Sequence, residues 1–474
     1  MGMIVLIAIF APVVGAFLLP LASRASEKLR NILSLVFVLT AVVCSAIALP
    51  LALTSRPASV EVHLPLGMSF GFLADGLAVF MAMISSFVGS IIVFYSFTYI
   101  DHYKHKDEYY LMITLFIGAM TGLVYSTNLI FIYVFWEIST ICCWRLIGFY
   151  REKEYIFRAD KAFLVTVFGA LMMLFGFLLI YQQTHTFNIT EMKGVDLSGG
   201  AVLLILIGMF TKSATLPFHT WLPDAGVAPS PVTSLLHAAV LVKIGVYAYA
   251  RLFLVSFTIG GVWHTVVPVV AAVSALVSAG AAIKENDIKR IIAYSTVSQL
   301  GFIFLGLSTG SAVGAAGGLL YILMHSLGKG GLFLCAGIVE HNAHTKDIRQ
   351  LGGLMKTMPL TGVSFLLCAF SIMGLPPFGG FFSKYMVISG AVRAGEPWVA
   401  AVFVIGAVMT IIYLLRVFTK VFMGEAKTLA AEGSRQMVAS VTGLAALSLA
   451  GGLFISFPAV FAQNIVYQMV VALK

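Results

Sequence analysis

The chain has 474 residues, of which 60% are hydrophobic and only 10% are charged. Soluble domains carry about 25% charged residues, so this composition excludes a soluble globular protein and indicates a polytopic membrane protein. The net charge of +9 does not indicate nucleic-acid binding, because the basic residues lie in short loops between apolar runs.

The apolar runs predict an all-α membrane protein with about 14 spanning helices. The first run is too long for a cleavable signal and lacks a basic start, so we expect a spanning helix there. Two later runs, 312–340 and 359–390, are long enough to be bent or broken. The polar loop 53–75 alternates in hydrophobicity, which predicts a short hairpin at one surface. The expected spans are 3–22, 31–52, 76–99, 109–126, 128–149, 161–182, 201–216, 232–255, 262–283, 288–307, 312–340, 359–390, 397–422 and 439–463.

Basic residues favour every second loop. The loops after the first, third, fifth, ninth, eleventh and thirteenth spans are basic, whereas the alternate loops hold scattered residues such as Arg56, Lys193 and Arg393. This pattern predicts that the basic loops lie in the cytoplasm and both termini outside. The expected location is a prokaryotic cytoplasmic (inner) membrane. The loop after the seventh span has no Lys or Arg and adds no support. The basic-loop residues are Arg24, Lys28, Arg30, Lys104, Lys106, Arg151, Lys153, Arg158, Lys284, Lys289, Arg290, Lys346, Arg349, Lys356, Lys427 and Arg435.

Two runs that lie five spans apart are interrupted by proline. The seventh contains FTKSATLPFHTW and the twelfth MGLPPFGGFFSKY, each with a lysine near its prolines. Proline breaks the helical hydrogen-bond ladder, so the freed carbonyls must face protein or water. Matching broken helices predict two five-helix repeats, the second inverted, with a site at their interface. The expected divisions are helices 1–3 with the hairpin (1–108), the first repeat with helices 4–8 (109–260), the second repeat with helices 9–13 (261–425) and helix 14 (426–474).

A lysine at membrane depth costs about 2.5–3.5 kcal/mol on insertion scales, so ionisable residues inside spans predict function. Glu137 lies near the middle of the fifth span, and Lys212 lies in the seventh span before Pro217. We expect Glu137 to be a switchable partner of Lys212. The alternatives are a permanent ion pair and a lysine that snorkels to the surface.

The eighth span carries Lys243 about three turns from its start, where His237 lies. Their spacing places them about 120° apart on an ideal helix, which predicts a link through water or another helix. A satisfied core histidine is nearly as good an interpretation of His237.

His325 and Lys329 are four residues apart and therefore share one helix face. Side by side they disfavour double protonation, which suits one transferable proton between them. The alternative is a pair between Lys329 and a carboxylate elsewhere. The neighbouring residues Gly328, Gly330 and Gly331 are expected to soften the helix and to leave room for water.

Lys384 follows the second interruption, in a segment (378–390) that could lie in the membrane or near its surface. A boundary lysine alone indicates an interfacial anchor, but the repeat favours a function. We therefore predict a buried relay that moves protons or Na⁺. Its residues are Glu137, Lys212, His237, Lys243, His325, Lys329 and Lys384.

Other ionisable clusters lie near the ends of the spans. Glu340, His341, His344 and Asp347 indicate a solvated helix end with a proton-uptake or partner-contact role behind it, and their spacing is not a specific metal signature. Asp224 is expected to be a cap or loop residue. Solvated loop pairs are expected among Lys284, Glu285, Asp287 and Lys289.

No cofactor or metal is expected in this chain. The five cysteines all lie in apolar runs and form no CxxC pair, which indicates small buried hydrophobes. Walker A, Rossmann, CxxCH and HExxH motifs are missing from the sequence. Energy must therefore come from an ion gradient or from a partner subunit. The cysteines are Cys44, Cys142, Cys143, Cys335 and Cys368.

Five segments together resemble a known family: FWEISTICCWRLIGFY, FTKSATLPFHTWLPDAGVAPSPVTSLLHAAVLVKIGVYAYARL, KENDIKRIIAYSTVSQLGFI, HSLGKGGLFLCAG and LPPFGGFFSK. They are similar to the antiporter-like subunits of respiratory complex I, of Mrp-type Na⁺/H⁺ antiporters and of membrane-bound energy-converting hydrogenases, over roughly residues 75–425. The resemblance implies fourteen core helices in two inverted five-helix repeats, with helices 7 and 12 broken. It also implies a glutamate–lysine pair (Glu137, Lys212), a central relay (Lys243, His237), its continuation (His325, Lys329) and a terminal residue (Lys384).

The terminal lysine looks more like that of the distal antiporter-like subunit in complex I and its hydrogenase relatives. The sequence ends at Lys474, however, without the long lateral helix of that distal subunit, which favours a hydrogenase, Mrp-type or other complex I-like assembly, or a middle subunit of an arm. We expect a proton- or Na⁺-translocating subunit of a redox-driven complex I-like or hydrogenase assembly. The alternatives are a subunit of an Mrp-type secondary Na⁺/H⁺ antiporter without redox chemistry and an inert scaffold. Expected partners are other membrane-arm subunits, including homologous antiporter-like ones, peripheral redox subunits and the lipid bilayer, but no nucleic acid.

Overall fold

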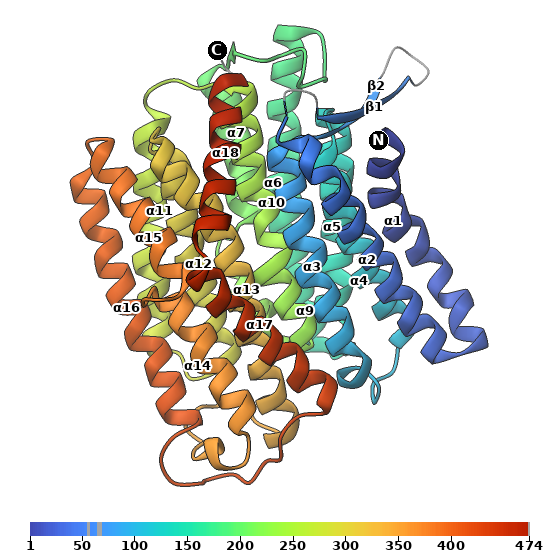
Figure 1. Ribbon diagram of the computed structural model, residues 1–474, viewed down its shortest axis with the longest axis vertical. Helices are drawn as coiled ribbons and strands as arrows, with labels where there is room; N and C mark the ends of the chain where they lie inside the picture. Colours follow the sequence, from blue (N-terminus) through green and yellow to red (C-terminus); the bar gives the residue numbers. More distant parts are fainter. Residues whose placement is uncertain (55–56, 64–68, 473–474) are drawn as a thin grey trace.

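Long helices run side by side along most of the molecule, and a short β-hairpin lies at one end (Figure 1). The computed structural model describes residues 1–54, 57–63 and 69–472, so Arg56 and Lys474 lie outside the described residues. Within that part, twelve helical segments are long and apolar enough, by length and composition, to cross a membrane. They are α1 (Gly2–Ala25), α2 (Glu27–Ala52), α3 (Gly76–Tyr99), α4 (Lys106–Tyr125), α5 (Leu129–Ile147), α6 (Lys153–Thr184), the segment Ser230–Ser256, α11 (Trp263–Lys284), α12 (Ile288–Ser308), α13 (Ala312–Ala343), α16 (Pro397–Val421) and α17 (Arg435–Leu453).

The loop before α3 forms the expected hairpin. β1 (Ala58–His63) pairs antiparallel with β2 (Ser69–Ala74), at the end of the bundle where the N-terminus lies (Figure 1). A second, two-residue pairing joins β3 (Val195–Asp196) to β4 (Phe257–Thr258) in parallel. Both chain termini lie at this same end of the molecule in Figure 1, as an even number of crossings requires.

The seventh expected span is broken, as its proline predicts. α7 (Gly199–Lys212) is followed by a left-handed turn at Ala214, where φ is +49°. The N–H of Thr215 donates to the carbonyl of Phe210 at 2.8 Å, and the N–H of Ala214 donates to the carbonyl of Thr211 at 3.3 Å. These two bonds form a Schellman cap, which satisfies carbonyls that the helix end leaves free. The chain then continues through α8 (Trp221–Asp224) and η2 (Ala225–Val227).

The twelfth expected span is broken by the same backbone motif. α14 (Pro359–Met373), which follows the short helix η5 (Leu354–Lys356), is capped by Gly374 with φ +83° and resumes as α15 (Gly379–Arg393). The N–H of Leu375 donates to the carbonyl of Phe370 at 3.1 Å. Glycine suits this position because φ is positive there and because a Cβ would lie 3.0 Å from Cδ of Lys384.

The eleventh expected span, in contrast, is one continuous helix, so the break allowed for 312–340 is not formed. Its glycines do not leave room for water either. A Cβ at Gly331 would lie 2.3 Å from Sγ of Cys368, and one at Gly328 would lie 2.9 Å from Cδ1 of Ile372. The glycines therefore allow α14 to approach α13 closely, as small residues do between membrane helices.

The last expected span, 439–463, is also not a single helix. α17 ends at Leu453, and α18 (Ser456–Ala472) starts after a turn at Phe454 and Ile455. The apolar composition is continuous across this turn, so hydropathy alone could not show the interruption.

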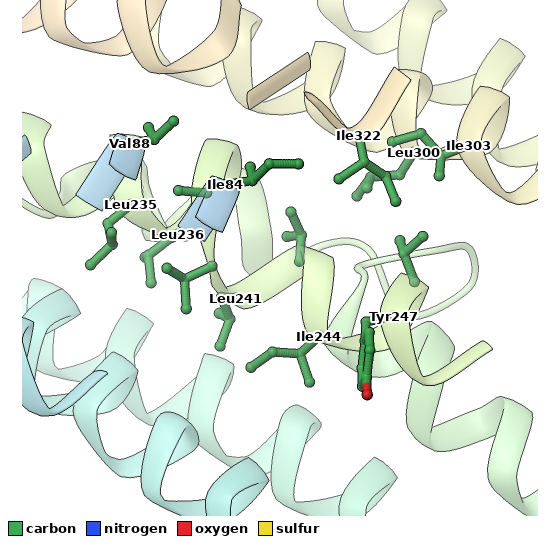
Figure 2. Packing of buried hydrophobic residues seen from close by; sticks show 14 of the residues in the cluster. Ile84, Val88, Leu235, Leu236, Leu241, Ile244, Tyr247, Leu300, Ile303 and Ile322 are labelled. Atoms are coloured by element: carbon green, nitrogen blue, oxygen red, sulfur yellow. The ribbon is translucent and has the colours of Figure 1, made fainter. Parts of the chain in front are cut away.

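The eighth span changes its helical form along its length. Its parts are α9 (Ser230–Ser234), the π-helix η3 (Leu235–Ala239), α10 (Leu241–Tyr249) and the π-helix η4 (Ala250–Ser256). A π-turn holds an extra residue and so changes the direction of the side chains that follow; such turns are frequent at functional sites. Figure 2 shows apolar side chains of this span lying among those of α3, α12 and α13. The labelled residues are Leu235, Leu236, Leu241, Ile244 and Tyr247 of the span, and Ile84, Val88, Leu300, Ile303 and Ile322 around it.

Candidate functional site

The basic residues of the predicted relay all lie inside the bundle. Five have no exposed surface, and the sixth, Lys384, is 3% exposed. Among the described residues, none of the six forms an ion pair with a carboxylate. A buried charge without a counter-ion is costly, so each side chain must find neutral partners or lose its proton. The five are Lys212, His237, Lys243, His325 and Lys329.

Lys212 reaches from the last turn of α7 to α5. Its Nζ donates to Oγ1 of Thr140 at 2.6 Å and to the carbonyl of Trp136 at 3.2 Å. The amine also lies 5.3 Å from the centre of the Trp136 ring, where a cation is attracted to the π-face. Lys212 is fully buried and therefore does not snorkel to the surface.

Glu137 follows Trp136 on α5 and is half-buried. Its buried Oε1 has no hydrogen-bond partner, and no ion pair within 4.0 Å joins it to Lys212. The permanent ion pair is therefore not formed in this structure. The amine is held instead at Thr140, three residues along the helix from Glu137.

Lys243 of α10 and His325 of α13 are brought into direct contact. Nζ of Lys243 lies 2.8 Å from Nδ1 of His325. At this distance one nitrogen donates a hydrogen to the other, and which of them donates depends on the tautomer of the histidine and on the charge of the pair. A doubly protonated pair would place two like charges side by side, so the pair can carry one excess proton but disfavours a second. The sequence suggested such sharing between His325 and Lys329; the structure gives His325 a different partner.

His237 lies on the π-helix η3 and packs on Phe333 of α13, with ring centres 4.5 Å apart. Both of its ring nitrogens are buried and have no hydrogen-bond partner among the described residues. It is therefore not a satisfied core histidine. His237 and Lys243 each contact α13, through Phe333 and His325 respectively.

Lys329 points from α13 to α12. Its Nζ donates to Oγ of Ser295 at 2.5 Å and to the carbonyl of Ile292 at 3.1 Å. Ser295 in turn lies 2.7 Å from the hydroxyl of Tyr413 on α16. The alternative of a carboxylate partner for Lys329 is not found in the described part of the chain.

Lys384 lies in the interior and not at the surface. Its Nζ donates to the carbonyl of Ile372 at 2.7 Å, in the last turn of α14, where the helix dipole favours a cation. The amine also lies 4.6 Å from the ring centre of Phe302. Ile372 stands two residues before Gly374, as Lys212 stands two residues before Ala214. At the first break the lysine itself, Lys212, stands in the last turn of the helix. At the second break Lys384 comes after the break, but its amine binds the carbonyl of Ile372 in the corresponding turn.

Several buried polar atoms beside the relay have no hydrogen-bond partner among the described residues. Native interiors contain few such atoms, and those that exist usually bind water. They mark the places where water can connect residues that do not touch one another. The atoms are Nε1 of Trp136, Oε1 of Glu137, both ring nitrogens of His237 and Nε2 of His325.

Lys289 is not part of a solvated loop pair, contrary to expectation. Its side chain is 1% exposed, and its Nζ donates to Glu340 at 2.9 Å and to the carbonyl of Ala228 at 2.8 Å. Asp287 caps α12 by accepting the N–H of Lys289 at 2.9 Å, which places the lysine in a buried first turn. The sequence did contain a signal for this position, because an aspartate before an apolar run is typical of a helix N-cap and would have placed Lys289 in a helix rather than in a loop. His341, beside Glu340, lies with its ring centre 5.4 Å from that of Tyr99.

Asp224 has a larger role than that of a cap. It pairs with Lys161 of α6 at 2.7 Å and with Arg290 of α12 at 2.8 Å, and so ties two helices to the segment after the first break. Burial alone would raise the pKa of Asp224, but the hydrogen bonds from Lys161 and Arg290 lower it below its ordinary value.

Asp75, which follows the hairpin, is not among the predicted site residues. It caps α3 by accepting the N–H of Ala78 at 2.9 Å and pairs with Arg251 of η4 at 2.5 Å. Burial favours a raised pKa for Asp75, but the guanidinium of Arg251 outweighs it and holds the pKa below its ordinary value. A cavity of about 610 Å³, lined in part by Asp75, Lys193 and Arg251, lies beside this pair.

In the described part of the chain, no group of three or more His, Cys, Asp or Glu side chains is placed to hold a metal ion. The five cysteines are free thiols, four of them buried.

Family models match most of the chain. Residues 126–410 match the model described as NADH:quinone oxidoreductase/Mrp antiporter, TM, and residues 63–110 match NADH-Ubiquinone oxidoreductase (complex I), chain 5 N-terminus. Similar relatives are the Na(+)/H(+) antiporter A subunits of Alkalihalophilus pseudofirmus (38% identical, 80% of this chain and 51% of that protein) and of Bacillus subtilis (34% identical, 88% and 56%). The chain thus spans little more than half the length of these relatives.

Solved structures show the same fold. A chain of the Mrp complex from Dietzia sp. DQ12-45-1b matches with a TM-score of 0.90 and 22% identity, covering 100% of both chains. A chain of the membrane-bound sulfane sulfur reductase, an archaeal respiratory membrane complex, matches with a TM-score of 0.89 and 23% identity, covering 99% of both. At these identities the likeness concerns the fold alone.

Proposed function

The chain belongs to the NADH:quinone oxidoreductase/Mrp antiporter family of transmembrane subunits, and we propose that it moves protons or Na⁺ as one of the subunits of a Na⁺/H⁺ antiporter complex. The relatives that support this proposal are named as Na(+)/H(+) antiporter A subunits. They favour the secondary antiporter, which was the alternative from sequence, over the redox-driven assembly that was the main expectation.

The contact between Lys243 and His325 carries the proposal. Two buried nitrogen bases lie 2.8 Å apart without an acidic partner among the described residues, so the pair can accept and release one proton at the centre of the bundle. The other lysines are held by carbonyls and hydroxyls, which do not neutralise them. Water at the partnerless atoms would complete the connections between the relay residues. A secondary antiporter would use the gradient of one ion to move the other.

We also propose that the chain has fourteen spans, which include two inverted repeats. Adding the broken helix that begins with α7 and the broken pair α14–α15 to the twelve long segments gives fourteen spans. The shared cap motif at the two breaks supports two inverted repeats, at 109–260 and 261–425, between 1–108 and 426–474. The common end of the two termini supports a topology with both termini on one side of a bacterial cytoplasmic membrane, and the positive-inside rule favours the outside for them.

Other membrane subunits are the proposed partners, since the solved structures of this fold come from multi-subunit membrane complexes. Peripheral redox subunits gain no support from relatives named for antiporters. Copurification tests this point, because iron–sulfur or nickel–iron proteins in the purified assembly would restore the redox-driven interpretation.

The central test is Lys243→Met in the intact assembly, in everted membrane vesicles that carry a pH gradient. Wild-type vesicles should lose part of the gradient when Na⁺ is added, and Lys243→Met vesicles should not, with normal assembly. Lys420→Met, which removes an exposed lysine on α16, is the matched control and should exchange normally. Full exchange by Lys243→Met would refute the relay.

Glu137→Ala and Lys212→Ala should also abolish transport without blocking assembly. Normal transport by both variants would favour an inert scaffold.

A further inference from the structure

A polar network centred on Gln299 of α12 lies between Lys329 and Lys384. The Nε2 of Gln299 donates to the hydroxyls of Thr410 at 3.1 Å and Tyr413 at 3.2 Å, both on α16. Its Oε1 accepts a hydrogen bond from the hydroxyl of Tyr321 on α13 at 2.5 Å. All four side chains are fully buried, so bulk water does not compete for these bonds.

The two sides of Gln299 lead to different relay residues. On one side, Tyr413 contacts Ser295 at 2.7 Å, and Ser295 accepts from Lys329 at 2.5 Å. On the other side, the ring centre of Tyr321 lies 5.6 Å from Nζ of Lys384 and 6.0 Å from the His325 ring. Hydrogen bonds through Gln299 therefore join Lys329 to Tyr321, and the ring of Tyr321 in turn contacts Lys384.

A carboxamide differs from a hydroxyl in proton transfer. A hydroxyl can take a proton on its oxygen and release its own, so a row of hydroxyls can pass protons along. A carboxamide accepts at its oxygen and donates from its nitrogen, and it would have to become an imidic acid to pass a proton on. Gln299 thus orients the hydroxyls of Tyr321 and Tyr413 but does not conduct between them.

We propose that Gln299 is a positioning residue that isolates Lys329 from Lys384 for proton transfer. A proton bound for Lys384 then leaves from His325, whose Nε2 is buried and free of a hydrogen-bond partner among the described residues. Lys329 influences the relay through its charge and hydrogen bonds, without passing its proton across Gln299. This inference rests on the proposed function, because it assumes that the relay carries protons.

The test replaces the carboxamide by a carboxyl group of the same size, Gln299→Glu. One carboxyl oxygen can take a proton from the Tyr413 side as the other releases one to Tyr321, so the acid keeps one proton. Lys329 then gains a hydrogen-bonded path to the Tyr321 hydroxyl, which passes its own proton on to water beside Lys384. In the intact assembly, His325→Asn alone should lose ion exchange. Gln299→Glu in the His325→Asn background should restore exchange to at least about tenfold above the His325→Asn rate.

Two controls separate this result from a general effect of a buried acid. Ser298 is adjacent and buried, but its hydroxyl has no hydrogen-bond partner within the described part of the chain and lies outside the network, so Ser298→Asp should not restore exchange. Adding Tyr321→Phe to the rescued variant should remove the rescue. If Gln299→Glu does not assemble, Gln299→His provides a second proton-passing side chain with the same expected result.

The inference is overturned if the rescue variants exchange no faster than His325→Asn, if Ser298→Asp rescues equally, or if His325→Asn retains wild-type exchange. The proposed function is judged separately by Lys243→Met in the wild-type background. A failed rescue combined with an inactive Lys243→Met variant therefore contradicts this inference alone.

Discussion

Most of the buried lysine amines in this molecule are held by uncharged hydrogen-bond acceptors. Lys212, Lys329 and Lys384 each donate to a main-chain carbonyl, and the first two also donate to a hydroxyl. These groups stabilise an ammonium, but they do not accept its proton readily. Lys243 differs, because its amine is hydrogen-bonded to the ring nitrogen of a histidine, at 2.8 Å. Among the relay lysines, Lys243 is therefore the one placed to give its proton directly to a base.

The ion pair of Asp75 and Arg251 makes stability depend on pH. The folded-state pKa of Asp75 lies below its ordinary value, so the pair stabilises the fold at neutral pH and this contribution is lost as the pH falls through the folded-state pKa. Asp75→Asn leaves the guanidinium of Arg251 buried without its partner. We expect a loss of about 3 kcal/mol at pH 7 and a smaller loss below about pH 4, measured by thermal unfolding in detergent across pH.

Asp347→Asn is the matched control for Asp75→Asn. Asp347 also has a lowered pKa, but its partner Arg349 is 69% exposed and lies two residues away in the chain. Exposed pairs contribute about 0–1 kcal/mol, so this variant should unfold nearly as the wild type does. Equal, small effects of both substitutions would show that the Asp75 pair does not stabilise the fold.

Among the elements, the two broken helices each end inside the bundle, next to a buried lysine amine. Each first half ends in a Schellman cap that satisfies its carbonyls, and a proline follows within three residues. The second break adds the amine of Lys384 to the helix end, where partial negative charge is concentrated. The backbone motif and the lysine therefore stabilise each other at this break.

The left-handed residues of the two breaks give a paired prediction. Gly374→Ala places a Cβ at φ +83° and 3.0 Å from Lys384, and should destabilise the fold by about 1–2 kcal/mol. Ala214→Gly removes a Cβ at φ +49° and should not lower the unfolding temperature. Thermal unfolding of both variants checks this. A Gly374→Ala protein as stable as the wild type would show that this cap is not under steric constraint.

For the whole molecule, the helices and loops predict which ends of the bundle face which side of the membrane. Lys193 lies in the loop before α7, at the end that holds both termini, and Lys427 lies in the loop between α16 and α17, at the opposite end (Figure 1). Both residues are exposed. Placing the basic loops inside makes Lys193 external and Lys427 cytoplasmic.

Cysteine labelling of intact cells tests this topology. Lys193→Cys should react with a membrane-impermeant maleimide added outside, and Lys427→Cys should react only after the cells are opened. The native cysteines give a low background, because four of the five are buried. Labelling of Lys427→Cys in intact cells, with Lys193→Cys protected, would invert the proposed orientation.

The sequence alone determined the elements and the candidate residues, because a segment in lipid must satisfy its backbone hydrogen bonds within itself. Hydropathy thus located α3 at 76–99, and proline predicted the break before Pro217. The tertiary structure decided the partners. Lys243 and His325 are 82 residues apart, Lys289 and Glu340 are 51 apart, and Gln299 and Tyr413 are 114 apart. Such contacts depend on how helices pack across the bundle, and no local pattern of residues contains that information.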